Sequence, residues 1–563
     1  MQQLILMVIA LPFASAMLTY LVSSRLGRRV ASVSVAIAWL TFLSAAVTVW
    51  LALSGSAAQE YTLFSRSPGG WGIIRFDSLG TLMAVVIAAI SLIVRIYSVR
   101  YMVEEPGYGR FFTLLDLMSG TLLLMVVAGD LITLLIAWHM VGILLYFLLG
   151  YDTRSRPAWR YAFWTWITYR FGDLPLLLAA ALLYQAYGSW SLSVIFEQLA
   201  AAPQIHTVFD LPLVEVVGAL VAVAAYARSA QFLLHSWLPY TMSGPTPVSA
   251  LMHAGIVNAG GFLVNRFAPV FVETSGVLHW VFIVGLVTSV IGSVLMLTQN
   301  DIKKALGYST MGQMGFMIME CGVGAFSLAI YHLIAHGLFK GTLFLSAGGV
   351  ISDARKDDGV PKDPLYDFVV EKNPARERKP WLLMAVFTLL VPAAILLLAH
   401  GLVDKDFYQK QGAIVLLFFG WVTGAQLIFV AYRMRTENLG RLFAMVIVSF
   451  AVVVIGYTLI SHAFDLFLYP DEVFRSRIYA AAGIDVIWFD SLVVLIAVII
   501  VAGWLRTYYR ERNGHLMDRA LKPLWLTFYA LVSREFYIND LYSWLAKRLE
   551  ALAMKMNVWL RWV

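Results

Sequence analysis

The chain has 563 residues, of which 60% are hydrophobic and 13% are charged, with a net charge of +7 and a mean hydropathy of +0.77. Soluble domains carry about 25% charged residues, so this chain has too much apolar surface for a water-soluble fold. The composition excludes a soluble enzyme, a nucleic-acid-binding protein and a disordered scaffold. The single cysteine, Cys321, excludes a disulfide framework and any zinc or iron–sulfur site built from cysteines.

Apolar runs long enough to cross a bilayer follow one another along the chain. A spanning helix needs ~20 mostly apolar residues, and these runs are too long and uniform for barrel strands. We therefore predict an all-α membrane protein with about fifteen transmembrane helices. The expected spans are Leu4–Ser24, Val30–Leu53, Ser78–Tyr101, Phe111–Val127, Leu131–Tyr151, Trp159–Tyr187, Leu211–Leu234, Val248–Phe271, Leu278–Leu297, Ile302–Cys321, Ala325–Ile351, Trp381–Leu402, Ile414–Tyr432, Leu442–His462 and Asp485–Leu505.

Basic residues are distributed unevenly between alternate loops. With the N-terminus outside, 31 of the 41 Lys and Arg residues fall on the inner side, Arg95 among them, and seven, including Arg266, on the outer side. Cytoplasmic loops are enriched in Lys and Arg. The distribution therefore predicts an outer N-terminus, a cytoplasmic C-terminus and an odd number of spans.

The end of the chain differs from the spans. Apolar side chains from Leu541 to Val563 fall on one face of a helix, and polar and basic ones fall on the other. Such a helix either lies on the cytoplasmic membrane surface or packs against a partner subunit, and the sequence leaves both open. Ser352–Lys379 is charged and proline-rich, so we interpret it as a connector on the inner face.

Ionisable side chains inside spans are costly, so each is a functional candidate. His332, His336 and Lys340 are spaced by four residues and share one helix face. We favour a proton or ion relay, because neutral imidazole both donates and accepts a proton. Interhelical hydrogen bonding is the second interpretation, and a metal site the third. The other candidates are Asp116, His139, Arg170, Asp173, Arg228, His253 and, at the end of the twelfth span, Lys405.

A proline-rich stretch interrupts the spans between Trp237 and Val248. Helices cannot continue through so many prolines, and unwound backbone at membrane depth is tolerated only where it is buried or lines a wet cavity. Broken helices of this kind mark transport sites in many transporters. Pro392 predicts a weaker break five spans later, which suggests a repeated five-helix unit. The residues of the first break are Pro239, Gly244, Pro245 and Pro247.

The stretch Gly244-Pro-Thr-Pro-Val-Ser-Ala-Leu-Met-His253 resembles the antiporter-like family. Its members are the proton-pumping membrane subunits of respiratory complex I and the large subunits of Mrp cation/proton antiporters. Supporting matches are Arg170-Phe-Gly-Asp173, Asp301-Ile-Lys-Lys304 and the stretch from His332 to Lys340. The resemblance implies broken helices, an ion path that includes Lys303, and no cofactor or metal. It also implies N-terminal helices (1–101), two inverted five-helix repeats (102–272 and 273–435), C-terminal helices (436–510) and a cytoplasmic tail (511–563).

Two positions depart from the family pattern. The fifth span has Trp138-His139 where the family usually has Trp-Glu, and the seventh has Arg228 where it has Lys. Arginine stays charged and cannot pass a proton on, and its charge disfavours protonated His139. We therefore expect Arg228 to be a fixed charge paired with a carboxylate, Asp116 first and Asp173 second.

A chain with these departures resembles the membrane subunits of the DAB inorganic-carbon accumulation complexes. The resemblance implies a bacterial inner-membrane subunit that conducts a cation, in the first place the proton. Its partner would be a large cytoplasmic zinc protein related to carbonic anhydrases, which performs the catalysis from carbon dioxide to bicarbonate. Two alternatives stay open. One is a proton-pumping subunit of a complex I-like NADH:quinone oxidoreductase or an Mrp antiporter, and the other is an inactive structural anchor.

Overall fold

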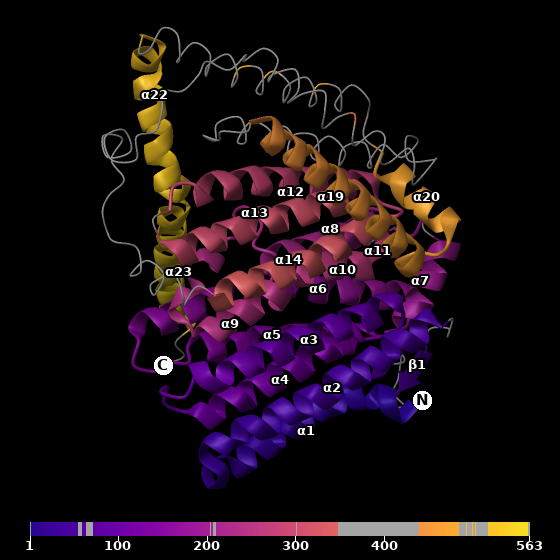
Figure 1. Ribbon diagram of the computed structural model, residues 1–563. Coiled ribbons are helices and arrows are strands. Elements are labelled where there is room, and N and C mark those ends of the chain that lie inside the picture. Colours follow the sequence, from indigo (N-terminus) through magenta and orange to yellow (C-terminus); the bar gives the residue numbers. More distant parts are fainter. Residues whose placement is uncertain are drawn as a thin grey trace.

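The structure is a computed structural model that describes residues 2–54, 59–63, 71–202, 204–206, 210–299, 301–346, 439–483 and 516–560, with single positions at 394, 491, 498 and 502. The described part is almost entirely helical, and most of its helices run side by side (Figure 1). Eight stretches in it are long and apolar enough to cross a membrane, and Leu6–Leu53 holds two successive helices. The predicted all-α membrane fold is confirmed. Lys405, the connector at 352–379, Pro392 and the spans expected at 381–402 and 414–432 lie outside the described residues, as does most of the span expected at 485–505.

The N-terminal helices follow the predicted spans closely. They are α1 (Gln2–Leu26), the 3-10 turn η1 (Gly27–Arg29), α2 (Val30–Leu53), α3 (Ser78–Tyr101), α4 (Tyr108–Val126) and α5 (Leu131–Leu149). The side chain of Asp77 caps α3 by accepting from the Gly80 amide at 2.8 Å, and Asp130 caps α5 in the same way. A short antiparallel hairpin, β1 (Gln59–Thr62) with β2 (Ile73–Phe76), precedes α3 and was not predicted.

The middle of the chain contains the interrupted helices. After α6 (Arg156–Tyr187) and the short α7 (Leu192–Ala201), α8 (Leu213–Arg228) ends six residues before the expected boundary at Leu234. The chain then passes through left-handed Ala230 and Leu233 into the 3-10 turn η2 (Leu238–Ser243). The return crossing, expected as one helix over 248–271, is instead four pieces. They are α9 (Thr246–Leu251), the π turn η3 (Met252–Ile256), α10 (Ala259–Arg266) and α11 (Ala268–Phe271).

The prolines explain where the chain breaks. Pro239 lies at the start of η2, and Pro247 at the start of α9, where a missing amide hydrogen removes no helical hydrogen bond. Gly244 lies between the two elements in extended backbone, and an added Cβ there would be 3.2 Å from Leu149. The break predicted from Pro239 to Pro247 is confirmed, and the π turn extends the irregular region by one more turn.

The remaining helices pack onto this region. They are α12 (Ser275–Met296), α13 (Ile302–Gly322), α14 (Phe326–Ser346), α19 (Leu439–Leu468) and α20 (Glu472–Ala481). The α12 and α13 backbones touch, because glycines remove the side chains between them. A Cβ added to Gly285 would lie 2.4 Å from the Met319 amide nitrogen.

Two C-terminal helices lie across the ends of the others. They are α22 (Leu516–Ser533) and α23 (Ile538–Leu560), joined by the turn η6 (Glu535–Tyr537). Figure 1 shows them roughly perpendicular to the bundle, at the end opposite to the start of α1. Apolar residues of α23 such as Leu545 and Leu549 are exposed, in agreement with the predicted amphipathic helix.

Candidate ion path

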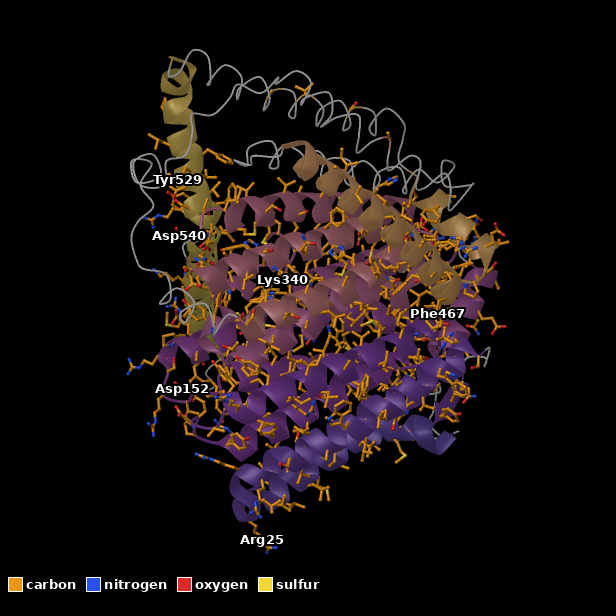
Figure 2. All side chains as sticks on the ribbon, in the orientation of Figure 1. Arg25, Asp152, Lys340, Phe467, Tyr529 and Asp540 are labelled. Carbon is orange, nitrogen blue, oxygen red and sulfur yellow. The ribbon has the colours of Figure 1, made fainter. Side chains whose placement is uncertain are left out.

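The predicted row on α14 lies beside the broken helix. His336 and Lys340 are buried and His332 is partly buried. Lys340 lies near the middle of the bundle in the view of Figure 2. The π turn approaches α14 closely, since a Cβ added to Gly337 would be 2.5 Å from the Ala254 carbonyl oxygen. This contact places buried His253 against α14, where its ring stacks on Phe344 with centroids 4.2 Å apart.

Several buried polar atoms in this region have no hydrogen-bond partner among the described residues. They include both ring nitrogens of His336 and Nδ1 of His253. A buried polar group without a partner costs about 1–3 kcal/mol. Polar sites of this kind in native proteins are normally satisfied by water. These atoms therefore leave hydrogen-bonding capacity on the row that bound water would satisfy.

Glu320 on α13 contacts the row at His332, the end away from Lys340. Its Oε2 atom lies 3.0 Å from Nδ1 of His332, whose Nε2 lies 2.9 Å from Oε1 of Gln313. Glu320 is fully buried and is not among the sequence-based candidates. The signal was present, because Glu320 is an ionisable residue within the span expected at 302–321.

A second cluster joins α5, α6 and α8. Asp173 lies 2.8 Å from Nη2 of Arg170, 2.9 Å from Nδ1 of His139 and 3.7 Å from Nη2 of Arg228. The Arg228 guanidinium is buried and stacks over Tyr169 and Trp138, at 4.1 and 4.5 Å from the ring centroids. His139 and Arg228, the two residues that depart from the family pattern, thus share the Asp173 carboxylate.

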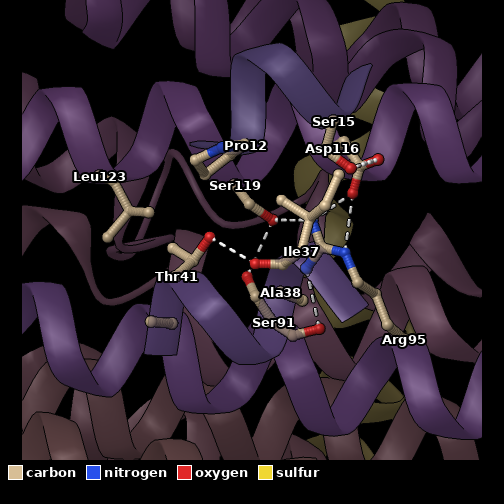
Figure 3. A pocket seen from close by; sticks show the side chains of 11 residues that line it. Pro12, Ser15, Ile37, Ala38, Thr41, Ser91, Arg95, Asp116, Ser119 and Leu123 are labelled. Carbon is tan, nitrogen blue, oxygen red and sulfur yellow. Dashed lines mark hydrogen bonds and ion pairs between the residues drawn. The ribbon is translucent and has the colours of Figure 1, made fainter. Parts of the chain in front are cut away.

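Asp116 does not take part in this cluster, so its expected pairing with Arg228 is wrong. It lies between the N-terminal helices, 2.7 Å from Nη2 of Arg95, and accepts a hydrogen bond from Ser15 (Figure 3). It also accepts one from Ser34. Ser15, Arg95 and Asp116 line a cavity of about 10 Å³, which holds about one water molecule. Asp173 pairs with Arg170 through one carboxylate oxygen and with Arg228 through the other, so Arg228 needs no second carboxylate.

The same contacts correct two positions in the count of loop charges. Arg95, counted with the inner loops, is buried in α3 against Asp116. Arg266, counted with the outer loops, is buried in α10 and pairs with Asp77. Burial alone raises the pKa of Asp77, but Arg266 and Arg75 together hold it below the usual value.

Lys303 and Lys304 lie in the first turn of α13, next to the break. Nζ of Lys303 is 3.3 Å from Oγ1 of Thr246, the first residue of α9. Nζ of Lys304 is 2.6 Å from Oε1 of Glu535 in η6. Glu535 also accepts from the Tyr240 hydroxyl in η2 at 2.9 Å. The turn η6 between α22 and α23, which we call the C-terminal elbow, is therefore bonded directly to the broken helix. In the described residues, no three His, Cys, Asp or Glu side chains lie close enough to hold a metal ion.

Solved structures support the fold. This chain matches a chain of the Mrp complex from Dietzia sp. with a TM-score of 0.60 at 23% identity, covering 98% of this chain and 60% of that one. A chain of the archaeal membrane-bound sulfane sulfur reductase matches with the same TM-score at 19% identity, over 85% and 100% of the two chains.

Sequence comparisons point the same way. Residues 128–364 match the family described as NADH:quinone oxidoreductase/Mrp antiporter, TM, and residues 73–112 match the N-terminus of complex I chain 5. The chain is 39% identical over 310 residues to NAD(P)H-quinone oxidoreductase chain 5 of Synechocystis, and spans about half (45%) of that protein's length. It is 56% identical over 552 residues, 98% of either chain, to the "Probable inorganic carbon transporter subunit DabB1" of Halothiobacillus neapolitanus. This chain therefore belongs to the antiporter-like family of membrane subunits that DabB1 and the chain 5 proteins share.

Proposed function

We propose that the chain conducts protons across the bacterial inner membrane as the membrane subunit of a complex that accumulates inorganic carbon. The full-length similarity to DabB1 supports the link to inorganic carbon. Catalysis belongs to a large cytoplasmic zinc-containing partner related to carbonic anhydrases, which hydrates carbon dioxide to bicarbonate. Proton flow through this chain drives that reaction in one direction.

The observation that carries the proposal is the row formed by partly buried His332 and buried His336 and Lys340 beside the broken helix. A charged lysine in the middle of a membrane protein is expensive and is retained where it acts. Lysine and histidine exchange protons readily, and the ring nitrogens of His336 and His253 have hydrogen-bonding capacity free for water. The path connects Lys303 and the break at one end with His332 at the other, by way of Lys340 and His336.

Arg228 acts on this path as a fixed charge. It keeps its proton at all relevant pH values, and Asp173 and two aromatic rings hold it in place. His139, which shares Asp173, is the movable group of this cluster. The path runs through both proposed repeats, 102–272 and 273–435, with Arg228 in the first and the α14 row in the second.

The inner face in this proposal is the end covered by α22 and α23. Asp152, in the loop with Arg154 and Arg156, lies at the same end as Asp540 of α23 (Figure 2). Cytoplasmic ends are the basic ones.

The segment from about Arg506, with its exposed apolar residues on α23, is the proposed docking surface for the cytoplasmic subunit, and 353–379 is a second contact. Deleting Leu541–Val563 should release the subunit while the helical body still inserts. Full co-purification of the subunit with the truncated chain would contradict the docking surface.

The test of function uses a bacterial host that lacks carbonic anhydrase and grows only at elevated carbon dioxide. Co-expression of the chain and its partner should restore growth in air, and a protonophore should abolish it. Lys340→Met should abolish growth with the complex still assembled. Thr342→Met is the matched control, because it places the same side chain on an exposed position of the same helix.

The alternatives give different results. An inactive anchor predicts full growth with Lys340→Met. A complex I-like subunit predicts that quinone-reducing subunits co-purify and that the chain does not support growth with the zinc partner alone. Either result would contradict the proposal.

A further inference from the structure

Glu320 has an environment that ordinary packing does not explain. It has no exposed surface, and its partner His332 packs against the Phe316 ring with centroids 5.5 Å apart. One carboxylate oxygen, Oε1, has no hydrogen-bond partner among the described residues. An isolated ionised carboxylate is strongly disfavoured in such surroundings, so a proton must be available to it.

That proton is within reach on His332. Its two ring nitrogens lie 3.0 Å from Oε2 of Glu320 and 2.9 Å from Oε1 of Gln313. A neutral imidazole carries only one N–H, so it cannot donate to two oxygens. With both nitrogens protonated, His332 donates to Gln313 and to ionised Glu320. With Glu320 protonated, the carboxylic acid donates to Nδ1, and Nε2 still donates to Gln313.

The two states differ by one proton along one hydrogen bond. When the Nδ1–H bond of His332 breaks, an O–H bond forms on Oε2 of Glu320, and the imidazolium–carboxylate pair becomes a neutral imidazole and a carboxylic acid. No heavy atom has to move. The pair has no net charge in either state, so the transfer does not leave an unpaired charge in an apolar site.

The pair lies at one end of the α14 row. His332 is one turn from His336, with ring centroids 6.3 Å apart, on the side away from Lys340. Glu320 is two residues from the end of α13, near the connection between α13 and α14. Figure 1 places this connection at the end of the bundle opposite to α23. Near the start of α14, Ser327 donates a hydrogen bond to Asp465 of α19, a partly exposed carboxylate at the same end.

We propose that Glu320 is the proton acceptor at the outer end of the α14 row, so that protons cross between the row and the outer face through the His332–Glu320 pair. The proposal rests on the proposed proton conduction and names its outer exchange group. Among the described residues, the titratable groups beside the pair include Cys321 on α13 and His336 on α14.

The test measures proton flux into vesicles that contain the intact complex, with a pH-sensitive dye. Glu320→Gln keeps the shape of the side chain but cannot take up a proton, so flux should fall about tenfold or more. Glu320→Asp should restore part of the flux with an altered pH profile. Glu273→Gln, the same change at a partly exposed carboxylate at the same end, is the control and should leave flux unchanged.

Infrared difference spectra between two pH values give a readout that does not depend on activity. The complex should show a carboxylic-acid carbonyl band that is lost in Glu320→Gln and displaced in Glu320→Asp. Full flux in Glu320→Gln, with flux lost in Lys340→Met, would overturn the role of Glu320 and leave the conducting function standing. Full flux in both variants would overturn both. If Glu320→Gln fails to assemble, an Asp variant with unchanged flux and an unchanged band overturns the proposal.

Discussion

Replacing Glu535 by glutamine should loosen the C-terminal helices α22 and α23 from the helical body. Glu535 is buried at the turn η6, where its carboxylate accepts from Lys304 at 2.6 Å and from Asn539 at 2.7 Å, as well as from Tyr240. Glutamine retains the shape and one acceptor oxygen but loses the negative charge. The perturbation therefore removes mainly the ion pair with Lys304.

The size of the effect follows from the geometry of the elbow. Hydrogen bonds to charged groups contribute about 1.5–3 kcal/mol, and Lys304 is partly exposed, so we expect a loss of about 2 kcal/mol. Three consecutive non-glycine residues, Glu535, Phe536 and Tyr537, have φ of 54–57°. Left-handed backbone costs about 1–2 kcal/mol for each such residue, and the contacts of Glu535 stabilise the turn against this unfavourable conformation. A loss of 2 kcal/mol makes opening about 30-fold more frequent.

Hydrogen–deuterium exchange of α23 in the purified complex measures the opening directly. Trypsin cleavage after exposed Arg534 provides a second readout. Glu550→Gln, at an exposed position of α23, is the matched control and should change neither. Unchanged exchange and cleavage in Glu535→Gln would refute the assignment of Glu535 as the residue that holds the elbow.

Acid should have the same effect as the substitution. Burial alone raises the pKa of Glu535, but hydrogen bonds from Lys304 and Tyr240 and the Lys304 charge lower it below the usual value. A folded-state pKa below the unfolded one stabilises the docked form above the unfolded value, which is about 4.3. The stabilisation is lost as the pH falls through the folded pKa. Exchange of α23 should therefore accelerate below about pH 4, and much less so in Glu535→Gln.

Three other substitutions test the packing of the bundle. Asp116→Asn leaves the Arg95 charge buried without its partner, so thermal unfolding should show a loss of about 3–5 kcal/mol. Arg228→Lys keeps the charge but loses the stacking on two aromatic rings, worth about 2 kcal/mol where desolvated, and should alter the pH profile of proton flux. Gly315→Ala places a Cβ 2.4 Å from an α12 backbone nitrogen and should lower the unfolding temperature, whereas Gly255→Ala meets nothing within 4 Å and should not. Equal stability of the two alanine variants would contradict the close packing.

The sequence predicts those features that local chemistry determines. Span lengths follow from the thickness of the bilayer, so α3 and α5 begin where expected. Prolines determine the break around Gly244, and helical geometry places His336 and Lys340 on one face. Each of these rules concerns residues near one another in the chain.

The pairings could not be predicted in this way, because they depend on which helices become neighbours. Arg95 lies near the end of an apolar run, where a long side chain can reach water or turn inward. Ser34 on α2, with Asp116 and Ser119 on α4, turns it inward. The bond between Tyr240 and Glu535 joins positions 295 residues apart. Glu320 could have been identified, because it meets the criterion that selected Asp116.

The backbone contact between α12 and α13 gives the molecule a stiff rod. Gly285, Gly292, Gly315 and Gly322 each lie where an added Cβ would approach the opposite backbone within 2.5 Å, so the two helices touch at several levels along their length. Helix α13 has 21 residues and is ~30 Å long. One end holds Lys304 against the C-terminal elbow, and the other end holds Glu320 against His332. Because a doubled helix resists bending, we expect α12 and α13 to move as one unit, so that the C-terminal turn and the His332–Glu320 pair are joined by a rigid element.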